Sequence, residues 1–173
     1  MLKFRDMTDG EFIQLIKNEA IEDYIKDIEV YREEFMKTFK GKTPKEFAEE
    51  QFKQNLVLGV KTPYNFFWIA IKEDTNEEIG YIWFTIMLEK KVSLLTNIRI
   101  KEEFQGQGLG TEMIHYWEKH VIDTYPEVDG VYLHCFRHNT RAKKLYDQLG
   151  FKLLQESFDG WNMIKAIIGK NRE

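Results

Sequence analysis

A glycine-rich segment, Gln105-Gly106-Gln107-Gly108-Leu109-Gly110-Thr111, constrains the fold of this chain more than any other stretch. It follows an apolar, strand-like run at 92–100 and leads into a helix-like run at 111–123. Glycine lets the backbone turn sharply and approach a ligand without a Cβ in the way. The start of a helix leaves about four backbone N–H groups free and carries the positive end of the helix dipole. The segment therefore predicts a strand–loop–helix unit that binds an anion, most often a phosphate.

Two familiar phosphate-binding patterns do not fit this segment. No Lys-Ser/Thr pair follows its last glycine, which excludes a Walker loop, and its G-x-G-x-G spacing differs from the G-x-G-x-x-G of dinucleotide-binding proteins. The remaining pattern is Q-x-x-G-x-G, formed by Gln105, Gly108 and Gly110. When the loop is considered alone, a strand-to-helix turn without a ligand is the alternative interpretation.

Composition and charge limit the class of protein. The 173 residues are 43% hydrophobic and 31% charged, which is typical of one globular domain. The net charge of −4 argues against a nucleic-acid partner, and the lack of a long uncharged apolar stretch argues against a membrane partner. The single cysteine, Cys135, excludes an intrachain disulfide, and the amino-terminal residues do not resemble a signal peptide. We therefore expect a cytoplasmic protein.

Hydrophobic periodicity predicts the remaining elements. Strands are expected at residues 2–6, 66–71, 79–87, 92–100 and 130–136, followed by a hairpin of 151–158 and 161–168. Helices are expected at 12–39, with a break near Glu22-Asp23, and at 44–56, 111–123 and 139–149. Thr43 and Glu46 form a capping-box pattern with Pro44 at the first helical position. About seven strands, mostly in antiparallel succession, and about four helices predict an α/β (α+β) domain with a mixed central sheet.

A second segment, residues 131–151, carries a distinctive spacing. A strand-like run is followed by Asn139, by the small residue Ala142, by Tyr146 and then by Gly150-Phe151. This spacing resembles the second motif of the GNAT N-acetyltransferase superfamily, and the Q-x-x-G-x-G pattern resembles the acyl-CoA signature of the same superfamily. The two motifs occur in the order typical of the family and cover residues 92–158, about the cofactor half of such a fold. The chain thus resembles a bacterial-type GNAT member.

The resemblance implies a single GNAT domain over residues 1–173, with an acceptor-side half at 1–90 and an acetyl-CoA-binding half at 91–173. It implies a GNAT-like, mostly antiparallel central sheet flanked by helices. It also implies that acetyl-CoA is the cosubstrate, that no metal takes part, and that an acetyl group passes to a primary amine by direct attack. The acceptor, a small-molecule amine or a peptide amine, is not identified by any motif in the chain.

The resemblance also assigns cofactor contacts. In the family, the strand before the loop pairs its backbone with the pantetheine arm, the loop holds the pyrophosphate, and the second motif lies beside the coenzyme. The positions that match these contacts are Ile98, Arg99, Ile100, Gln105, Gly106, Gln107, Gly108, Leu109, Gly110, Thr111, Asn139, Ala142 and Tyr146.

Tyr146 matches the general acid of the family. Its phenol can donate a proton to the thiolate that leaves when the thioester breaks. On helical spacing alone, Tyr146 fits a core aromatic residue better. Its place after Asn139 and before Gly150-Phe151 favours the catalytic role.

The group that accepts the proton of the amine is left open. His134 is one candidate because an imidazole titrates near neutral pH, and another carboxylate or a water-mediated route are the others. His134 also fits a satisfied histidine on a sheet. Strand alternation places Cys135 on the opposite face, where we expect a small buried residue rather than a nucleophile. His115 and His120 lack the H-E-x-x-H spacing and do not indicate a metal site.

Several alternatives stay open at this point. Arg141 and the Lys143-Lys144 pair fit a solvated helix face, or a contact with the 3′-phosphate of coenzyme A. The whole chain fits an N-acetyltransferase, a non-catalytic acyl-CoA-binding or regulatory module, or a protein N-terminal or lysine acetyltransferase. A homodimer is an option because folds with exposed sheet edges often pair.

Overall fold

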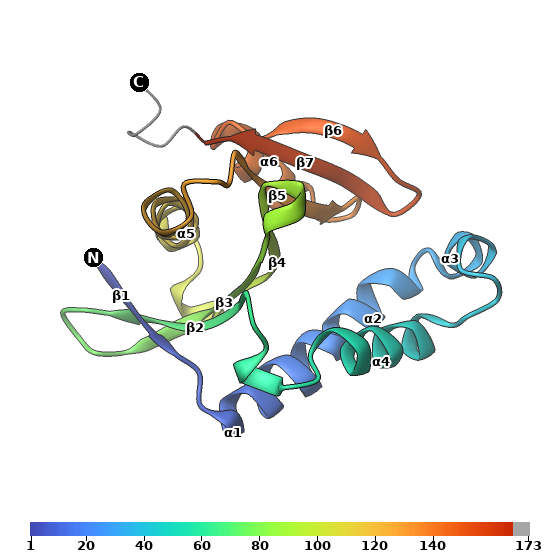
Figure 1. Ribbon diagram of the computed structural model, residues 1–173, viewed down its shortest axis with the longest axis horizontal. Coiled ribbons are helices and arrows are strands. Elements are labelled where there is room, and N and C mark those ends of the chain that lie inside the picture. Colours follow the sequence, from blue (N-terminus) through green and yellow to red (C-terminus); the bar gives the residue numbers. More distant parts are fainter. Residues whose placement is uncertain (168–173) are drawn as a thin grey trace.

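The computed structural model describes residues 1–167, which build one twisted sheet with helices on both faces (Figure 1). The sheet has seven strands in the order β1-β2-β3-β4-β5-β7-β6. Their bounds are β1 Leu2–Asp6, β2 Asn65–Lys72, β3 Glu78–Met87, β4 Val92–Ile100, β5 Gly130–Phe136, β6 Lys152–Glu156 and β7 Gly160–Ala166. Every neighbouring pair is antiparallel except β4 and β5. The expected mostly antiparallel sheet is confirmed, while Ile168 of the expected last strand lies outside the described residues.

The helices follow the predicted order with shifted ends. They are α1 Asp9–Glu11, a π-helical segment Phe12–Ala20, α2 Ile21–Glu29, α3 Arg32–Thr38, α4 Pro44–Asn55, α5 Leu109–Thr124 and α6 Thr140–Gln148. The segment Phe12–Ala20, α2 and α4 lie on one side of the sheet, and α5 and α6 lie on the other (Figure 1).

The long amino-terminal run is broken, but the expected break near Glu22-Asp23 is wrong. The chain continues as a helix through those residues and turns at Val30 and Tyr31 instead. Charged residues in a helix do not break it, because their side chains reach solvent. The turn lets Phe35 of α3 pack its ring 6.2 Å from Phe158, next to β7.

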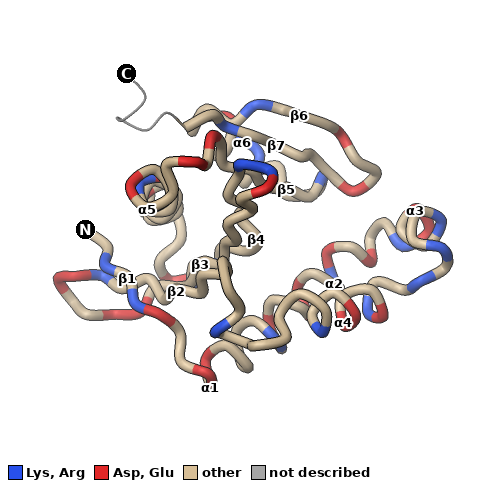
Figure 2. Tube along the Cα trace, viewed as in Figure 1, with Lys and Arg blue, Asp and Glu red and all other residues tan. Residues whose placement is uncertain are grey.

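The capping box predicted before α4 is present. Thr43 Oγ1 accepts a hydrogen bond from Glu46 N at 3.2 Å, and Glu46 Oε2 accepts one from Thr43 N at 2.9 Å. Two backbone donors at the start of the helix are therefore satisfied by side chains. Basic and acidic residues are both present along α3 and α4, whereas α2 carries four acidic residues and one lysine (Figure 2).

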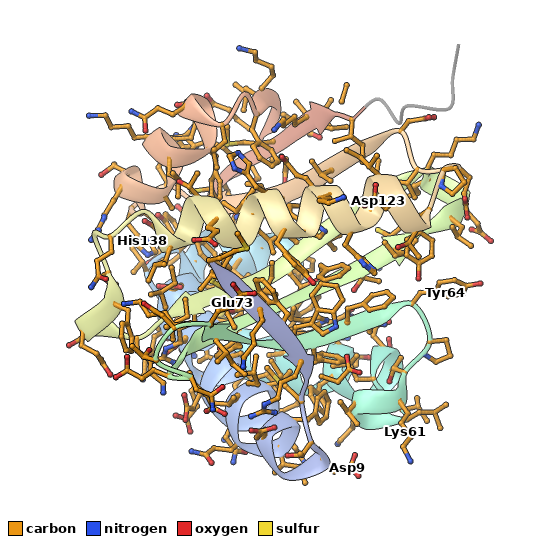
Figure 3. All side chains as sticks on the ribbon, turned by 90° about the vertical axis from the view of Figure 1, so that its left-hand side faces the viewer. Asp9, Lys61, Tyr64, Glu73, Asp123 and His138 are labelled. Carbon is orange, nitrogen blue, oxygen red and sulfur yellow. The ribbon has the colours of Figure 1, made fainter. Side chains whose placement is uncertain are left out.

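Helix α5 lies across the strands, as the view from its own side shows (Figure 3). Its apolar stripe Leu109, Met113, Trp117 and Val121 is buried, as the spacing predicts. Trp117 Nε1 donates to Ser93 Oγ of β4 at 2.9 Å, so the buried polar groups are paired. This packing fixes the start of α5 relative to the carboxyl end of β4.

No helix within residues 1–167 is long and apolar enough to cross a membrane.

An aromatic cluster surrounds His120 near the end of α5. The imidazole packs edge-on against Trp68 at 4.7 Å and Phe66 at 5.4 Å between ring centroids. Its Nε2 is buried and has no hydrogen-bond partner among residues 1–167. Burial lowers the pKa of His120, and the nearby carboxylate of Asp123 opposes this effect. The folded chain therefore favours the neutral imidazole.

We predict that protonation of His120 favours unfolding. A histidine pKa that is lower in the folded chain gives stability that is complete above the unfolded value of about 6.5 and declines as the pH falls below it. The free energy of unfolding, measured in urea, should fall more steeply from about pH 7 to pH 5 in the wild type than in His120→Phe. His115→Gln, at an exposed site on α5, should keep the wild-type slope. An unchanged slope in His120→Phe would contradict the prediction.

Candidate active site

Strands β4 and β5 part at the centre of the sheet. They are paired from Val92–Gly130 to Leu95–Leu133 and not beyond. At the same point the register between β3 and β4 shifts, so that Thr96 is an extra residue in β4. A bulge of this kind bends a strand and increases its twist. The β5-facing edge of β4 after Leu95 is therefore left without a neighbouring strand.

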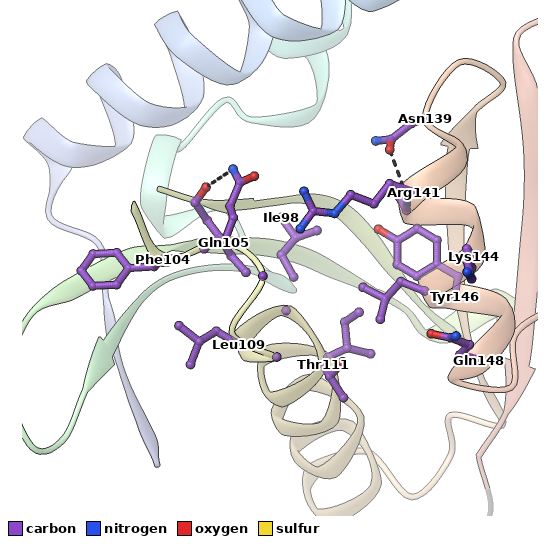
Figure 4. Close-up of a pocket in the computed structure, with 17 residues that line it drawn as sticks. Ile98, Phe104, Gln105, Leu109, Thr111, Asn139, Arg141, Lys144, Tyr146 and Gln148 are labelled. Atoms are coloured by element: carbon purple, nitrogen blue, oxygen red, sulfur yellow. Dashed lines mark hydrogen bonds between the residues drawn. The ribbon is translucent and has the colours of Figure 1, made fainter. Parts of the chain in front are cut away.

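A cavity of about 470 Å³ occupies this opening. The carboxyl end of β4, the glycine-rich loop with the start of α5, and one face of α6 line it (Figure 4). All of the residues predicted from the two motifs line it except Arg99 and Gln107. Segments more than thirty positions apart in the sequence, such as Gly108 and Asn139, thus face one space.

The glycine-rich loop has the backbone shape that its composition predicts. Gly106 and Gly108 have φ values of +77° and +78°, a left-handed conformation that favours glycine. Gly108 is the N-cap of α5 and offers no side-chain cap, so the first N–H groups of the helix are not satisfied by a capping side chain. Gln105 Nε2 donates to Ile100 O at 3.0 Å, which holds the loop against the end of β4. These features are typical of a backbone loop that binds an anion.

Asn139 positions the start of α6. Its Oδ1 accepts a hydrogen bond from Ala142 N at 3.1 Å, which makes it the N-cap of the helix. An asparagine side chain has two further donors on its nitrogen, and these are not used in the cap. Asn139 therefore both begins α6 and presents donors at the cavity wall.

The basic residues at the start of α6 fall into two groups. Arg141 and Lys144 line the cavity (Figure 4). Lys143 lies elsewhere, because its Nζ is 2.7 Å from both oxygens of Asp147 and lies over the ring of Trp161. Arg141 and Lys144 thus fit a contact with a ligand in the cavity, whereas Lys143 fits an ordinary position on the helix surface.

Tyr146 is a buried residue of α6 whose hydroxyl points away from its own helix toward β4 (Figure 4). Tyr146 lines the cavity and is 7% exposed. Burial raises the pKa of Tyr146 well above its ordinary value, and the nearby Cys135 adds to the effect. The phenol therefore stays protonated and can serve as a hydrogen-bond donor or an acid.

Cys135 is buried on the opposite face of β5 from His134. Its Sγ lies 3.6 Å from Asn139 O and 3.8 Å from Phe136 O. Burial raises the pKa of the Cys135 thiol to about 11, which disfavours the reactive thiolate. These features support the interpretation of Cys135 as a small buried residue.

The side chain of Arg99 is directed away from the cavity. Its Nη1 is 2.8 Å from Asp23 Oδ2 and 3.4 Å from Glu19 Oε2, so it connects β4 to α2 and the preceding π-helical segment. Only the backbone of Arg99 is left to serve the predicted cofactor contact. Gln107 Nε2 donates to Glu103 O at 3.1 Å and supports the loop from outside the cavity.

On the α2 side of the sheet, the base candidate His134 belongs to a polar cluster whose other members the sequence does not single out. His134 of β5 lies next to Asn162 of β7 and Asp159 of the preceding turn. Asp159-Gly160 reads in the sequence only as a turn, and Asn162 belongs to no motif. Strand pairing brings these residues together, and the order of residues along the chain does not reveal that pairing.

Among residues 1–167, no group of three or more His, Cys, Asp or Glu side chains is placed to hold a metal ion.

Comparisons with known proteins bear on this site. A family model described as the acetyltransferase (GNAT) family matches residues 28–151. The chain is 25% identical over 110 residues to an uncharacterized N-acetyltransferase of Bacillus subtilis (strain 168), YycN, covering 61% of this chain and 67% of that protein. A spermine/spermidine N(1)-acetyltransferase of the same organism is 30% identical over 88 residues, which cover 50% of each protein.

Solved structures show the same fold. The crystal structure of YycN from Bacillus subtilis superimposes with a TM-score of 0.73 at 17% identity, covering 91% of this chain and 96% of that one. A spermidine N-acetyltransferase from Vibrio cholerae, in complex with CoA and spermine, superimposes with a TM-score of 0.64 at 18% identity, covering 95% of each chain.

Proposed function

Because the chain belongs to the GNAT acetyltransferase family, we propose that its cavity binds acetyl-CoA and that the chain transfers the acetyl group to a primary amine by direct attack. The observation that carries this proposal is the parting of β4 and β5, since the glycine-rich loop and Tyr146 face one cavity there.

The cavity walls suit the parts of the cosubstrate. The free edge of β4 around Ile98 and Ile100 offers backbone groups to the amides of the pantetheine arm. The N–H groups from Gln105 to Thr111 offer donors to the pyrophosphate. Asn139 and Ala142 lie on the facing wall, where an amide donor and a small side chain leave room for the arm.

The chemistry follows from this placement. The amine attacks the thioester carbon, and a backbone N–H of β4 near the bulge at Thr96 stabilises the oxyanion. The C–S bond then breaks and leaves a thiolate. Tyr146 donates its phenolic proton to that sulfur. Burial raises the pKa of Tyr146, and the same surroundings would raise the pKa of a thiol held beside it, which favours transfer of the proton to the sulfur.

The acceptor in this proposal is a small primary amine of the polyamine type. Two relatives are named for spermidine or spermine, and the net charge of −4 suits a cationic substrate. A peptide amine is the runner-up. The single cysteine supports a cytoplasmic setting. A homodimer fits β6, which lies at a sheet edge with Leu153 and Leu154 exposed.

We predict that Tyr146→Phe lowers kcat by about 100-fold or more, which is the usual range for loss of a general acid. The acetyl-CoA dissociation constant should not change, because the ring and its packing against Phe151 are kept. Thiol release measures turnover, and calorimetry measures binding. Tyr116→Phe, at an exposed site on α5, is the matched control and should behave as the wild type. Full turnover by Tyr146→Phe would remove Tyr146 from the mechanism.

We predict that Arg141 and Lys144 recognise the 3′-phosphate of coenzyme A, since both line the cavity. Replacing both with Gln should weaken CoA binding about tenfold or more, the effect of losing a charge-assisted contact, while binding of dephospho-CoA changes little. Lys143→Gln is the control, because Lys143 already pairs with Asp147. If the double variant still prefers CoA over dephospho-CoA as strongly as the wild type, this contact is wrong.

A further inference from the structure

The polar cluster on the α2 side of β5 contains an unusual pair of groups. His134 Nε2 is buried without a hydrogen-bond partner among residues 1–167. The Asp159 carboxylate faces it, with Oδ1 3.6 Å from that nitrogen. A buried polar atom without a partner costs free energy, so its retention calls for a physical reason.

The hydrogen bonds around His134 indicate which ring nitrogen carries the hydrogen in the neutral imidazole. Nδ1 lies 3.1 Å from Asn162 Oδ1, which also accepts a hydrogen bond from Tyr132 Oη at 2.7 Å. A carboxamide oxygen can only accept, so Nδ1 carries the hydrogen. In the neutral ring, the lone pair of Nε2 is then free and faces a carboxylate. Two acceptors at this separation are stabilised when a proton or a cationic donor joins them.

Hydrogen bonds hold Asp159 in place but leave one of its carboxylate oxygens unused. Ser157 Oγ donates to Oδ1 at 2.6 Å, and the backbone N–H of Arg137 donates to Asp159 O at 2.7 Å. Within residues 1–167, Oδ2 accepts no hydrogen bond, and the side chain is 14% exposed. The carboxylate can therefore meet a donor from solvent, while Nε2 behind it cannot.

The pair borders the opening between the strands. Pairing of β5 with β4 ends at Leu133, and His134 is the next residue. His134 shares its face with Phe136, whose ring centroid lies 6.2 Å from that of Tyr24 on α2. Cys135 and Tyr146 lie on the other face. An acceptor that approaches from α2 therefore meets Asp159 and His134, while the cosubstrate and Tyr146 serve the opposite side.

We propose that Asp159 and His134 form the proton-accepting pair for the acceptor amine, an inference that rests on the proposed acetyl transfer. The carboxylate of Asp159 binds the ammonium group. One N–H bond of the ammonium breaks, and the proton passes through the carboxylate to form an N–H bond at His134 Nε2. The free amine attacks, and the imidazolium, stabilised by the carboxylate, later releases its proton to solvent. The second amine proton replaces the one that Tyr146 gives to the thiolate.

The ionisable groups around the pair include two phenols. Tyr132 lies on the same strand, and Tyr24 faces it from α2. Burial raises the pKa of both phenols, that of Tyr24 to about 12 with a further contribution from Asp159. Asn162 of β7 does not ionise. Two ion pairs also lie close by, Arg137 with Glu156 and His138, just after β5, with Asp27. The substitutions at His134 and Asp159 therefore identify which part of the pH dependence comes from the pair.

The test compares pH profiles of kcat/KM for the wild type, His134→Gln and Asp159→Asn, with spermidine and a panel of other primary amines as acceptors. Each variant should lose about 100-fold or more near neutral pH. The loss should shrink about tenfold per pH unit as the pH rises, because a primary amine with a pKa near 10 then deprotonates unaided. The KM for acetyl-CoA should stay at the wild-type value. His115→Gln is the matched control, at an exposed site on α5.

The outcomes separate this inference from the proposed function. Thermal unfolding with and without acetyl-CoA checks that each variant is folded and still binds the cosubstrate. If the wild type turns over and both folded variants keep its pH profile, the pair has only a structural role and this inference is overturned alone. If the wild type releases no thiol with any amine, the proposed function fails and the inference fails with it.

Discussion

The structure depends on the loss of backbone pairing between β4 and β5 after Leu95 and Leu133. Backbone N–H and C=O groups need partners, and a strand edge at the centre of a sheet normally finds them in its neighbour. Here the bulge at Thr96 turns the end of β4 away, so its edge faces a cavity instead. The glycine-rich loop and α6 enclose that cavity. The backbone groups on this edge of β4 therefore face the cavity and are open to a ligand.

The two sides of the opening are joined across the sheet by α2. Arg99 of β4 pairs with Asp23, and His138, just after β5, lies 3.0 Å from Asp27 through its Nε2. Asp23 and Asp27 are one helical turn apart, so one helix contacts both diverging strands. Exposed ion pairs add little stability, but they fix which face of α2 meets the opening. The α2 side of the opening is therefore aligned with the cavity on the other side.

The sequence predicts the parts of the site that depend on local backbone chemistry. Left-handed glycines such as Gly108, and the spacing from Asn139 to Tyr146 along one helix, are properties of short segments. The sequence does not predict the turn at Val30, because this turn allows a contact between residues far apart in the chain, Phe35 and Phe158. The parting of the strands and the pairing of His134 with Asp159 depend on register between remote strands, which no local pattern specifies.

The measurement that tests the central claim most directly is thermal unfolding with and without acetyl-CoA, with NAD and ATP as controls. A ligand that binds only the folded chain stabilises it by RT ln(1 + [L]/Kd), about 2.7 kcal/mol at a hundredfold excess over Kd. A rise in Tm with acetyl-CoA, and little change with NAD or ATP, is the result we predict. An unchanged Tm at millimolar acetyl-CoA would contradict the account, because the opening between β4 and β5 would then be a structural feature without its ligand.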